Sequence, residues 1–194
     1  MRRSLLLILL AVSLATPATA LDRCESLRQE VRRAHFYYLG LDYPWRYGIG
    51  QLQQESNCRN VLSRDGVGSE GYAQITWKWW GKHLAKAGIP EVRTTRNNLR
   101  AQAFIMKDAW GQARGRLWVA YQIYNGGRLV LKEIDRAGIL CWEAAKQECR
   151  RKIITFNNGQ QISACDINYD YSKKVYEYGE RYGGGATHSK FIFW

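Results

Sequence analysis

The sequence has no C-x-x-C pair, and its three histidines are far apart along the chain. Neither pattern has the ligand spacing of a zinc site, so we expect no metal and no cofactor. Internal repeats, low-complexity linkers and the motifs of common nucleic-acid-binding folds are also missing. These absences favour one domain that binds no nucleic acid, with structural or surface roles for His35, His83 and His188.

A long apolar run occurs only once, at the N-terminus. Residues 4–14 are mostly apolar, follow Met1-Arg2-Arg3 and precede Pro17-Ala18-Thr19-Ala20, whose small residues signal peptidase accepts. The run is shorter than the about 20 residues of a membrane span. We therefore expect a signal peptide over 1–20, cleaved after Ala20, a secreted or periplasmic protein, and no stable membrane insertion after cleavage.

Acidic residues are scarce, with 17 Asp and Glu against 29 Lys and Arg, for a formal net charge of +12. Loss of the signal peptide would remove Arg2 and Arg3 and leave 174 residues with a charge of +10, enough for one domain with a sizeable core. A basic surface attracts polyanions. For an exported protein these are cell-wall polymers and anionic lipid surfaces before nucleic acid.

All five cysteines lie after the predicted cleavage site: Cys24, Cys58, Cys141, Cys149 and Cys165. Export favours disulfides, and the odd number leaves at least one thiol unpaired or paired between chains. We predict a Cys149–Cys165 disulfide, because Asn158-Gly159 lies almost midway between them and a hairpin there would bring them together. A second candidate pair is Cys24–Cys58, which leaves Cys141 free.

Apolar periodicity and turn residues predict a mainly helical chain. The expected helices cover residues 25–36, about 43–56, 77–87, about 99–110, 117–124, 129–137, 142–152 and 172–181. Asp42 is the predicted N-cap of the second helix, with Pro44 in its first turn. Residues 57–76 are expected to form a loop with a small hairpin, and 153–162 another hairpin. Asn125-Gly126-Gly127 would end the helix before it in the manner of a C-cap.

Glu55 lies at the end of the second of these helices, at the edge of its apolar stripe. Trp45, Ile49, Leu52 and Ser56 share that stripe, so Glu55 stands beside apolar surface rather than opposite it. Burial against such surface raises the pKa of a carboxyl group and keeps it protonated nearer neutral pH. A protonated acid is what cleavage of a glycosidic bond requires, because the leaving oxygen must receive a proton.

Three short segments follow one another in an informative order. They are Glu55-Ser56, then Gly71-Tyr72-Ala73-Gln74-Ile75, then Tyr124-Asn125-Gly126-Gly127, with Ser63-Arg64-Asp65-Gly66 between the first two. Together they resemble the signature segments of the lysozyme-like lytic transglycosylases, family 23 of the glycoside hydrolases. The resemblance covers roughly residues 43–127. Tyr72 and Ala73 stand where the family usually has Leu and Met.

The resemblance implies a mainly α, lysozyme-like (α+β) fold. We expect that domain over 21–138, with a small hairpin and loop region, and a Cys-containing C-terminal extension over 139–194 packed on it. It also implies cleavage of the peptidoglycan glycan strand after N-acetylmuramic acid, with closure of a 1,6-anhydro ring, by a protein that we expect to be monomeric. Glu55 would act first as acid and then as base on the 6-hydroxyl.

The other predicted site residues have substrate-binding roles. Ser56 would bond the N-acetyl group or serve only as a hydroxyl at the helix end, and Gln74 would bind a sugar amide or cap a hairpin. Tyr124 would donate its hydroxyl to Glu55 or pack in the core. Asn125 would bind substrate or act as a C-cap, and Tyr72 would lie on the cleft floor. One of Trp77, Trp79 and Trp80 is expected at the cleft as a platform for a sugar ring.

Two other functions stay open. A hydrolytic goose-type lysozyme needs a second carboxylate, for which Asp65 and Glu70 are the only acids between Glu55 and Glu91. Both lie in a glycine-punctuated loop where turn and surface roles are expected. The family's transglycosylases need no second carboxylate, because the N-acetyl group of the substrate stabilises the positive centre. A non-catalytic wall-binding module would use the same cleft without the acid.

Overall fold

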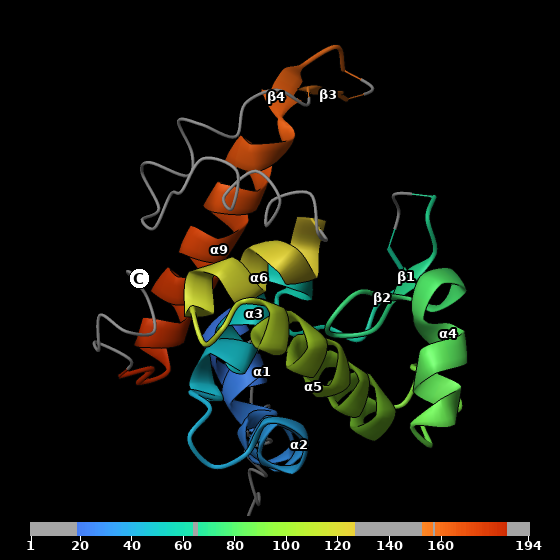
Figure 1. Cartoon of the computed structure of the whole chain (residues 1–194), viewed down its shortest axis with the longest axis vertical. Coiled ribbons are helices and arrows are strands. Elements are labelled where there is room, and N and C mark those ends of the chain that lie inside the picture. The colour runs from blue at the N-terminus through green and yellow to red at the C-terminus, as the bar shows by residue number, and fades with distance from the viewer. Residues whose placement is uncertain (1–18, 64–65, 127–152, 157, 186–194) are drawn as a thin grey trace, which may run out of the picture.

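The computed structural model describes residues 19–63, 66–126, 153–156 and 158–185. The described chain is mainly helical, as predicted, with two small antiparallel hairpins (Figure 1). Its helices are α1 (Ala20–Ser26), α2 (Arg28–Leu39), α3 (Arg46–Ser56), α4 (Trp77–Lys86), α5 (Thr95–Gln112), α6 (Leu117–Gly126) and α9 (Ala164–Arg181). The strands are β1 (Ser69–Glu70), β2 (Ile75–Thr76), β3 (Ile153–Thr155) and β4 (Gln161–Ser163).

Both predicted hairpins are present. In the first, Ser69 pairs with Thr76 and Glu70 with Ile75. In the second, Ile154 pairs with Ile162 across the turn that holds Gly159, whose φ is +80°. Such a φ suits glycine, which has no Cβ to clash with the following carbonyl. The two helices expected at 129–137 and 142–152 lie outside the described residues.

Several predicted helix boundaries were wrong. The helix expected over 25–36 is two helices that meet at Leu27. Asp42 does not cap α3, which begins at Arg46 after a turn held by backbone bonds, such as the 2.8 Å bond from the Trp45 amide to the Tyr43 carbonyl. The last helix begins at Ala164, eight residues earlier than 172, because the Ser163 hydroxyl accepts from the Asp166 amide and caps it there.

The core surrounds α3, which packs against α1, α2 and α9. α5 lies against both α2 and α6, and α9 crosses α6 as well as α3. Ile49 and Leu52 of α3 are fully buried in one apolar cluster, and Tyr47 in a second. α9, from the predicted C-terminal extension, thus shares its contacts with the N-terminal helices rather than standing apart from them.

The α3–α9 crossing is close because glycines face each other. A Cβ added to Gly50 would lie 2.5 Å from the Gly179 amide nitrogen and from the Val175 carbonyl oxygen. A Cβ on Gly179 would overlap the ring of Tyr47. No larger residue at position 50 fits without moving the backbone of α9.

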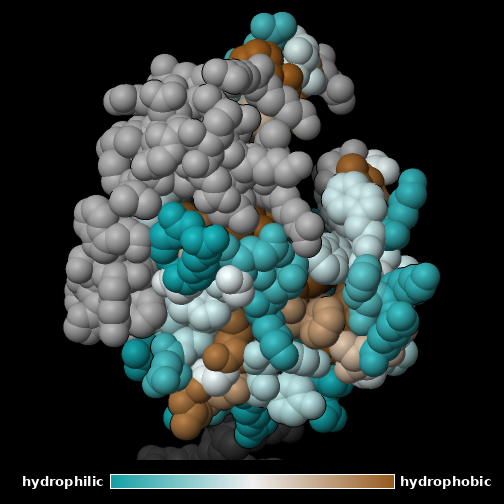
Figure 2. Space-filling view, in the orientation of Figure 1, coloured by the Kyte–Doolittle hydropathy of each residue, from teal (hydrophilic) through white to brown (hydrophobic). Residues whose placement is uncertain are grey.

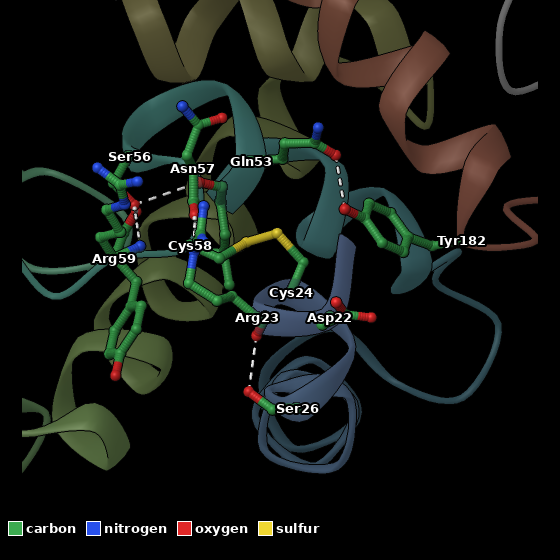
Figure 3. Close-up of a disulfide and its surroundings, with 12 residues drawn as sticks. Asp22, Arg23, Cys24, Ser26, Gln53, Ser56, Asn57, Cys58, Arg59 and Tyr182 are labelled. Carbon is green, nitrogen blue, oxygen red and sulfur yellow. Dashed lines mark hydrogen bonds between the residues drawn. A yellow bond between two sulfur atoms is a disulfide. The ribbon is translucent and has the colours of Figure 1, made fainter. Parts of the chain in front are cut away.

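The predicted Cys24–Cys58 disulfide is confirmed. It joins buried Cys24 of α1 to Cys58, the second residue after the end of α3, with a Cα–Cα distance of 5.2 Å (Figure 3). Beside it, the Tyr182 hydroxyl donates to Gln53 of α3 at 2.6 Å, so the chain after α9 also contacts this region. Cys165 is disulfide-bonded too, but Cys149 of the other predicted pair lies outside the described residues.

The histidines that the structure describes have different surroundings. His35 is fully buried, donates from Nδ1 to the Val31 carbonyl at 2.8 Å and stacks on Tyr43. His83 is exposed on α4, and His188 lies outside the described residues. Among the described residues, no group of three or more His, Cys, Asp or Glu side chains is placed to hold a metal ion. No described helix has the length and apolar character of a bilayer span.

Candidate active site around Glu55

Glu55 lies in the last turn of α3. The helix ends because Asn57 adopts a left-handed conformation, with φ +53°, while its amide still bonds back to Gln53. Asparagine tolerates this conformation better than most residues. The buried Ile49–Leu52 side of α3 holds the helix in the core, and Glu55 projects from its end into a polar hollow.

Burial raises the pKa of the Glu55 carboxyl from an ordinary 4.5 to about 7. A hydrogen bond from the Tyr171 hydroxyl, 2.5 Å from Glu55 Oε1, opposes the shift because it stabilises the carboxylate. Desolvation is the larger effect. Glu55 is therefore present in both protonation states near neutral pH, as an acid that later acts as a base requires.

Two buried side-chain amides hold the Tyr171 hydroxyl in position. The Tyr171 hydroxyl accepts from Gln51 Nε2 at 3.2 Å, and Gln51 Oε1 accepts from Gln102 Nε2 at 2.9 Å. Gln51 and Gln102 are completely buried. Side chains held in this way have little freedom, so α3, α5 and α9 together fix the position of the Tyr171 hydroxyl and of the carboxyl that it contacts.

Tyr171 was not among the predicted site residues. The last helix was expected to begin at Ser172, so Tyr171 was placed outside it. In the structure Asn168, Tyr171, Val175 and Gly179 are buried along one face of α9. That stripe was present in the sequence and would have drawn attention to Tyr171 had the helix been extended toward its N-terminus.

A central hollow of about 360 Å³ opens in front of Glu55. Its walls come from the β1–β2 hairpin and the chain before it, from α4, from α5 and from the end of α6. The described residues lining it are Glu55, Ser63, Ser69, Gln74, Ile75, Thr76, Trp79, Trp80, Ile105, Tyr124 and Asn125. Among these residues, Glu55 is the only acid.

Two further hollows adjoin the central one. Trp80 also lines an aromatic hollow of about 870 Å³ between α4 and α5, with Phe104 and Ile123 on its walls. Brown and tan side chains are visible between these two helices in Figure 2. On the other side, Glu55 and Asn125 also line an α9 hollow of about 360 Å³, together with Asp170 and Lys174. We call the three hollows the Glu55 groove, in which Glu55 stands where the central hollow meets the α9 hollow.

Gln74 and Tyr124 line the central hollow. Gln74 has φ +47°. Its side-chain nitrogen Nε2 donates to the Gly71 carbonyl at 2.8 Å and to the Val61 carbonyl at 3.1 Å. The Tyr124 hydroxyl contacts the Ala73 carbonyl at 3.5 Å, whereas the bond to Glu55 that was expected of it comes from Tyr171. Burial, and then the charge of Glu55, raise the pKa of Tyr124.

Asn125 faces both the central hollow and the α9 hollow. It lies inside α6, which runs to Gly126, and not at a C-cap beyond the helix. Its amide nitrogen donates to Asn168 Oδ1 at 2.7 Å, and Asn168 in turn donates to the Ala164 carbonyl. These bonds hold the end of α6 against α9 beside Glu55.

Ser56 and Tyr72 are not among the described residues that line the three hollows. The Ser56 hydroxyl donates to the Tyr72 carbonyl at 2.7 Å and accepts from the Arg59 amide at 3.1 Å (Figure 3). The Tyr72 hydroxyl lies 3.4 Å from the Thr95 hydroxyl of α5. In this structure both residues brace the loop against α3 and α5.

The acids near Glu55 have different positions. Glu70 pairs with Arg93 at 3.1 Å and is not among the residues that line the groove. Asp65 lies outside the described residues. Asp170, which the sequence did not single out, is exposed on α9 and lines the α9 hollow with Glu55.

Two tryptophans line the central hollow, whereas only one of the three was expected there. Trp79 is 64% exposed and Trp80 is shared with the aromatic hollow, while the Trp77 ring packs against Gly81. Exposed indole rings are suited to stacking on the faces of sugar rings. Comparison with known proteins adds no assignment, because no family model and no curated protein matches the chain.

Proposed function

We propose that the protein is an exported peptidoglycan lytic transglycosylase that cleaves the bond between N-acetylmuramic acid and N-acetylglucosamine. The observation that carries the proposal is the Glu55 carboxyl, whose pKa burial raises to about 7 at the wall of an open polar hollow. A buried carboxyl that can be protonated near neutral pH destabilises the folded chain when it ionises, and such groups are concentrated at catalytic sites.

The reaction divides into two proton transfers by the same carboxyl. Protonated Glu55 donates to the glycosidic oxygen as the bond to the muramic acid carbon breaks. The resulting carboxylate then takes the proton of the 6-hydroxyl, whose oxygen bonds that carbon and closes the anhydro ring. Tyr171 donates to the carboxylate formed in between, which lowers the energy of the state after the first transfer.

The composition of the central hollow supports a mechanism with one acid. Glu55 is the only carboxylate among the described residues lining it, and Glu70 is engaged with Arg93 outside it. Retaining and inverting glycosidases generally place a second carboxylate close to the first, unless the substrate supplies the stabilising group itself. The N-acetyl group of the glycan is such a group.

The groove suits a polymer better than a small molecule. The central hollow shares Trp80 with the aromatic hollow and Glu55 with the α9 hollow, an arrangement in which an extended glycan would pass the acid instead of ending at it. Trp79 and Trp80 offer aromatic faces on one side. Asn125, Asp170 and Lys174 offer polar groups on the other.

A hydrolytic lysozyme is the second candidate, and Asp170 is the observation that favours it. Asp170 is an acid in the same hollow as Glu55, on a different helix. A carboxylate in that position would activate water in place of the sugar 6-hydroxyl. The two candidates share the acid Glu55 and differ in the product.

Replacement of Glu55 by Gln tests both candidates against a binding role. The change keeps the size of the side chain and removes the proton donor. We expect the rate of clearing of purified cell wall to fall at least about 100-fold, the lower range for loss of a general acid. Glu70→Gln, which removes an acid of the β1–β2 hairpin that does not line the groove, is expected to stay within about threefold of the wild type. A Glu55→Gln protein that clears wall at a tenth of the normal rate would exclude Glu55 as the acid.

A further inference from the structure

Another large hollow lies between α2 and α5, and none of the described residues lining it also lines the Glu55 groove. It has a volume of about 640 Å³. The described residues lining it are Glu30, Arg33, Ala34, Tyr37, Tyr38, Arg96 and Arg100. We call it the arginine hollow.

Positive charge dominates the arginine hollow, with three guanidinium groups and one carboxylate. Glu30 Oε1 bonds Arg33 at 2.7 Å, so the one acid is already paired. Within the described residues, Arg96 and Arg100 have no carboxylate partner. They are four residues apart on α5, a spacing at which like charges repel on a helix. The pair is therefore stabilised by any anion that enters the hollow.

One of these guanidinium groups is already oriented. Arg100 Nη1 donates to the Gly88 carbonyl at 3.3 Å, and Nη2 donates to the Tyr38 hydroxyl at 3.4 Å. Neither partner neutralises the charge, but both restrict the side chain. Arginine held in this way binds the oxygen atoms of phosphate through paired N–H groups at a smaller entropic cost than a free side chain.

An exposed tyrosine, Tyr37, lines the arginine hollow, and a second exposed apolar side chain, Leu41, follows the end of α2. Tyr37 on α2 and Leu41, just after the end of α2, each expose 77% of their surface, more than any other large hydrophobic residue that the structure describes. The Tyr37 ring is packed edge-on against Tyr38, with ring centroids 4.7 Å apart. A soluble polyanion gives such residues no apolar partner, whereas the boundary between lipid headgroups and acyl chains is where tyrosine is enriched.

We propose that the face formed by α2 and α5 docks on an anionic lipid surface, with a phosphate headgroup in the arginine hollow and Tyr37 and Leu41 in the interface. Figure 1 shows α2 at one end of the molecule and the β3–β4 hairpin at the other. The β1–β2 hairpin and α6, which frame the Glu55 groove, lie between those ends. This proposal does not depend on the reaction at Glu55.

Vesicle binding of the full chain tests the docking. The probes are vesicles of phosphatidylcholine alone and vesicles that also contain phosphatidylglycerol, and the readout is the ratio of the two partition coefficients. The N-terminal segment, with Arg2 and Arg3, is the same in the wild type and in every variant, so its contribution cancels when their ratios are compared. A basic residue near an anionic surface contributes about 1 kcal/mol, so Arg96→Gln with Arg100→Gln is expected to lower the ratio roughly 25-fold.

A matched control removes two other cations. Lys82 and Lys86 are exposed, lie four residues apart on α4, and are not among the described residues lining the arginine hollow or the Glu55 groove. Lys82→Gln with Lys86→Gln changes the net charge by the same amount, and we expect it to lower the ratio less than threefold. Equal losses in the two double variants would mean that net charge alone attracts the protein, and would overturn the proposal.

Two single variants complete the test. Glu30→Gln releases Arg33 and is expected to raise the ratio, a gain that damage to the fold does not produce. Tyr37→Ser is expected to weaken vesicle binding while leaving the affinity for soluble polyphosphate unchanged. If Tyr37→Ser leaves vesicle binding unchanged, the hollow takes phosphate from soluble polymers and the lipid surface is the wrong partner.

Discussion

At the scale of a single residue, the raised pKa of the Glu55 carboxyl couples the stability of the folded chain to pH. Its pKa is about 7 in the folded chain against an ordinary 4.5, so the folded state holds more protons than the unfolded state between these values. The free energy of unfolding therefore falls as the pH rises from about 4.5 to about 7. The shift corresponds to a loss of about 3 kcal/mol.

Denaturant unfolding of the wild type and of Glu55→Gln measures this loss. Glutamine stays neutral, so we expect the variant to gain stability relative to the wild type as the pH rises, by about 3 kcal/mol at about pH 8 compared with about pH 4. Burial lowers the pKa of His35 to about 4, which has the opposite effect in part of the same range. His35 is present in both proteins and cancels in the difference. A difference that is constant with pH would show that the pKa of Glu55 is not raised.

Tyr171→Phe separates the orientation of Glu55 from its chemistry. The variant removes the bond that stabilises the carboxylate, so the pKa of Glu55 should rise. A hydrogen bond to a charged group contributes roughly 1.5–3 kcal/mol, which corresponds to about one to two pKa units. We expect kcat to fall, KM to change little, and the alkaline limb of the pH–rate profile to move to higher pH. Tyr178→Phe on the same helix is the control, and an unshifted limb in Tyr171→Phe would assign Tyr171 a purely structural role.

At the residue scale, the sequence predicted part of the candidate site. Glu55, Gln74, Tyr124 and Asn125 line one hollow, as their order in the chain suggested. Tyr171 is 116 residues from Glu55, and no local pattern specifies a contact across that separation. The directions of short side chains were equally hard to predict. The Ser56 hydroxyl, for example, points toward a backbone carbonyl that only the folded loop brings within hydrogen-bond distance.

At the scale of elements, the crossing of α3 and α9 determines whether Tyr171 reaches Glu55. Gly50→Ala would place a methyl group 2.5 Å from the backbone of α9, and backbone cannot rotate away as a side chain can. We expect a loss of roughly 1–3 kcal/mol in the free energy of unfolding, and a lower kcat as α9 moves from α3. Gly111→Ala is the stability control, because the space around that helical glycine is open. A Gly50→Ala protein as stable as the control would contradict the close crossing.

The Cys24–Cys58 disulfide acts on the same end of α3, because Cys58 follows Glu55 by three residues. The two cysteines are 34 residues apart, for which the chain-entropy model gives about 4 kcal/mol of stabilisation. We expect Cys24→Ala with Cys58→Ala to lose that amount in denaturant unfolding under oxidising conditions. The disulfide of Cys165 is present in both proteins and does not affect the difference. A loss below about 1 kcal/mol would contradict the prediction.

Elements were easier to predict than their limits or their packing. Leu99, Ala103, Met106 and Trp110 share an apolar stripe, and the helix that they indicated exists as α5. The predicted start of α3 was wrong, because a turn held by backbone hydrogen bonds precedes the helix and the Asp42 side chain does not cap it. Which helices cross was not predictable from periodicity, because a buried stripe shows that a partner exists without naming it.

At the scale of the whole molecule, charge is distributed in a way that composition does not reveal. The net charge of +12 is consistent with many arrangements. In the structure three arginines meet between α2 and α5, while Trp79, Trp80 and Glu55 meet in another hollow. Each cluster combines residues from different helices, so only the packing of those helices creates it.

The product of the proposed reaction depends on which acids take part, and the two candidates come from distant parts of the chain. Glu55 comes from α3 and Asp170 from α9, and both line the α9 hollow. With Glu55 as the sole acid, the tethered 6-hydroxyl of the same sugar has the advantage of effective concentration over water. We therefore expect mass spectrometry of digested wall to find 1,6-anhydro ends from the start. Hydrolysis would instead give fragments heavier by one water, about 18 Da.

Asp170→Asn decides between the two routes, because it removes the one described acid that shares a hollow with Glu55. Asp170 is exposed, and denaturant unfolding of the variant beside the wild type separates a lower rate from a loss of stability. For a lytic transglycosylase we expect the rate to stay within about threefold and the anhydro product to persist, since no water has to be activated. Loss of at least about 100-fold, together with reducing ends in the wild-type digest, would make Asp170 the second catalytic carboxylate and the protein a lysozyme.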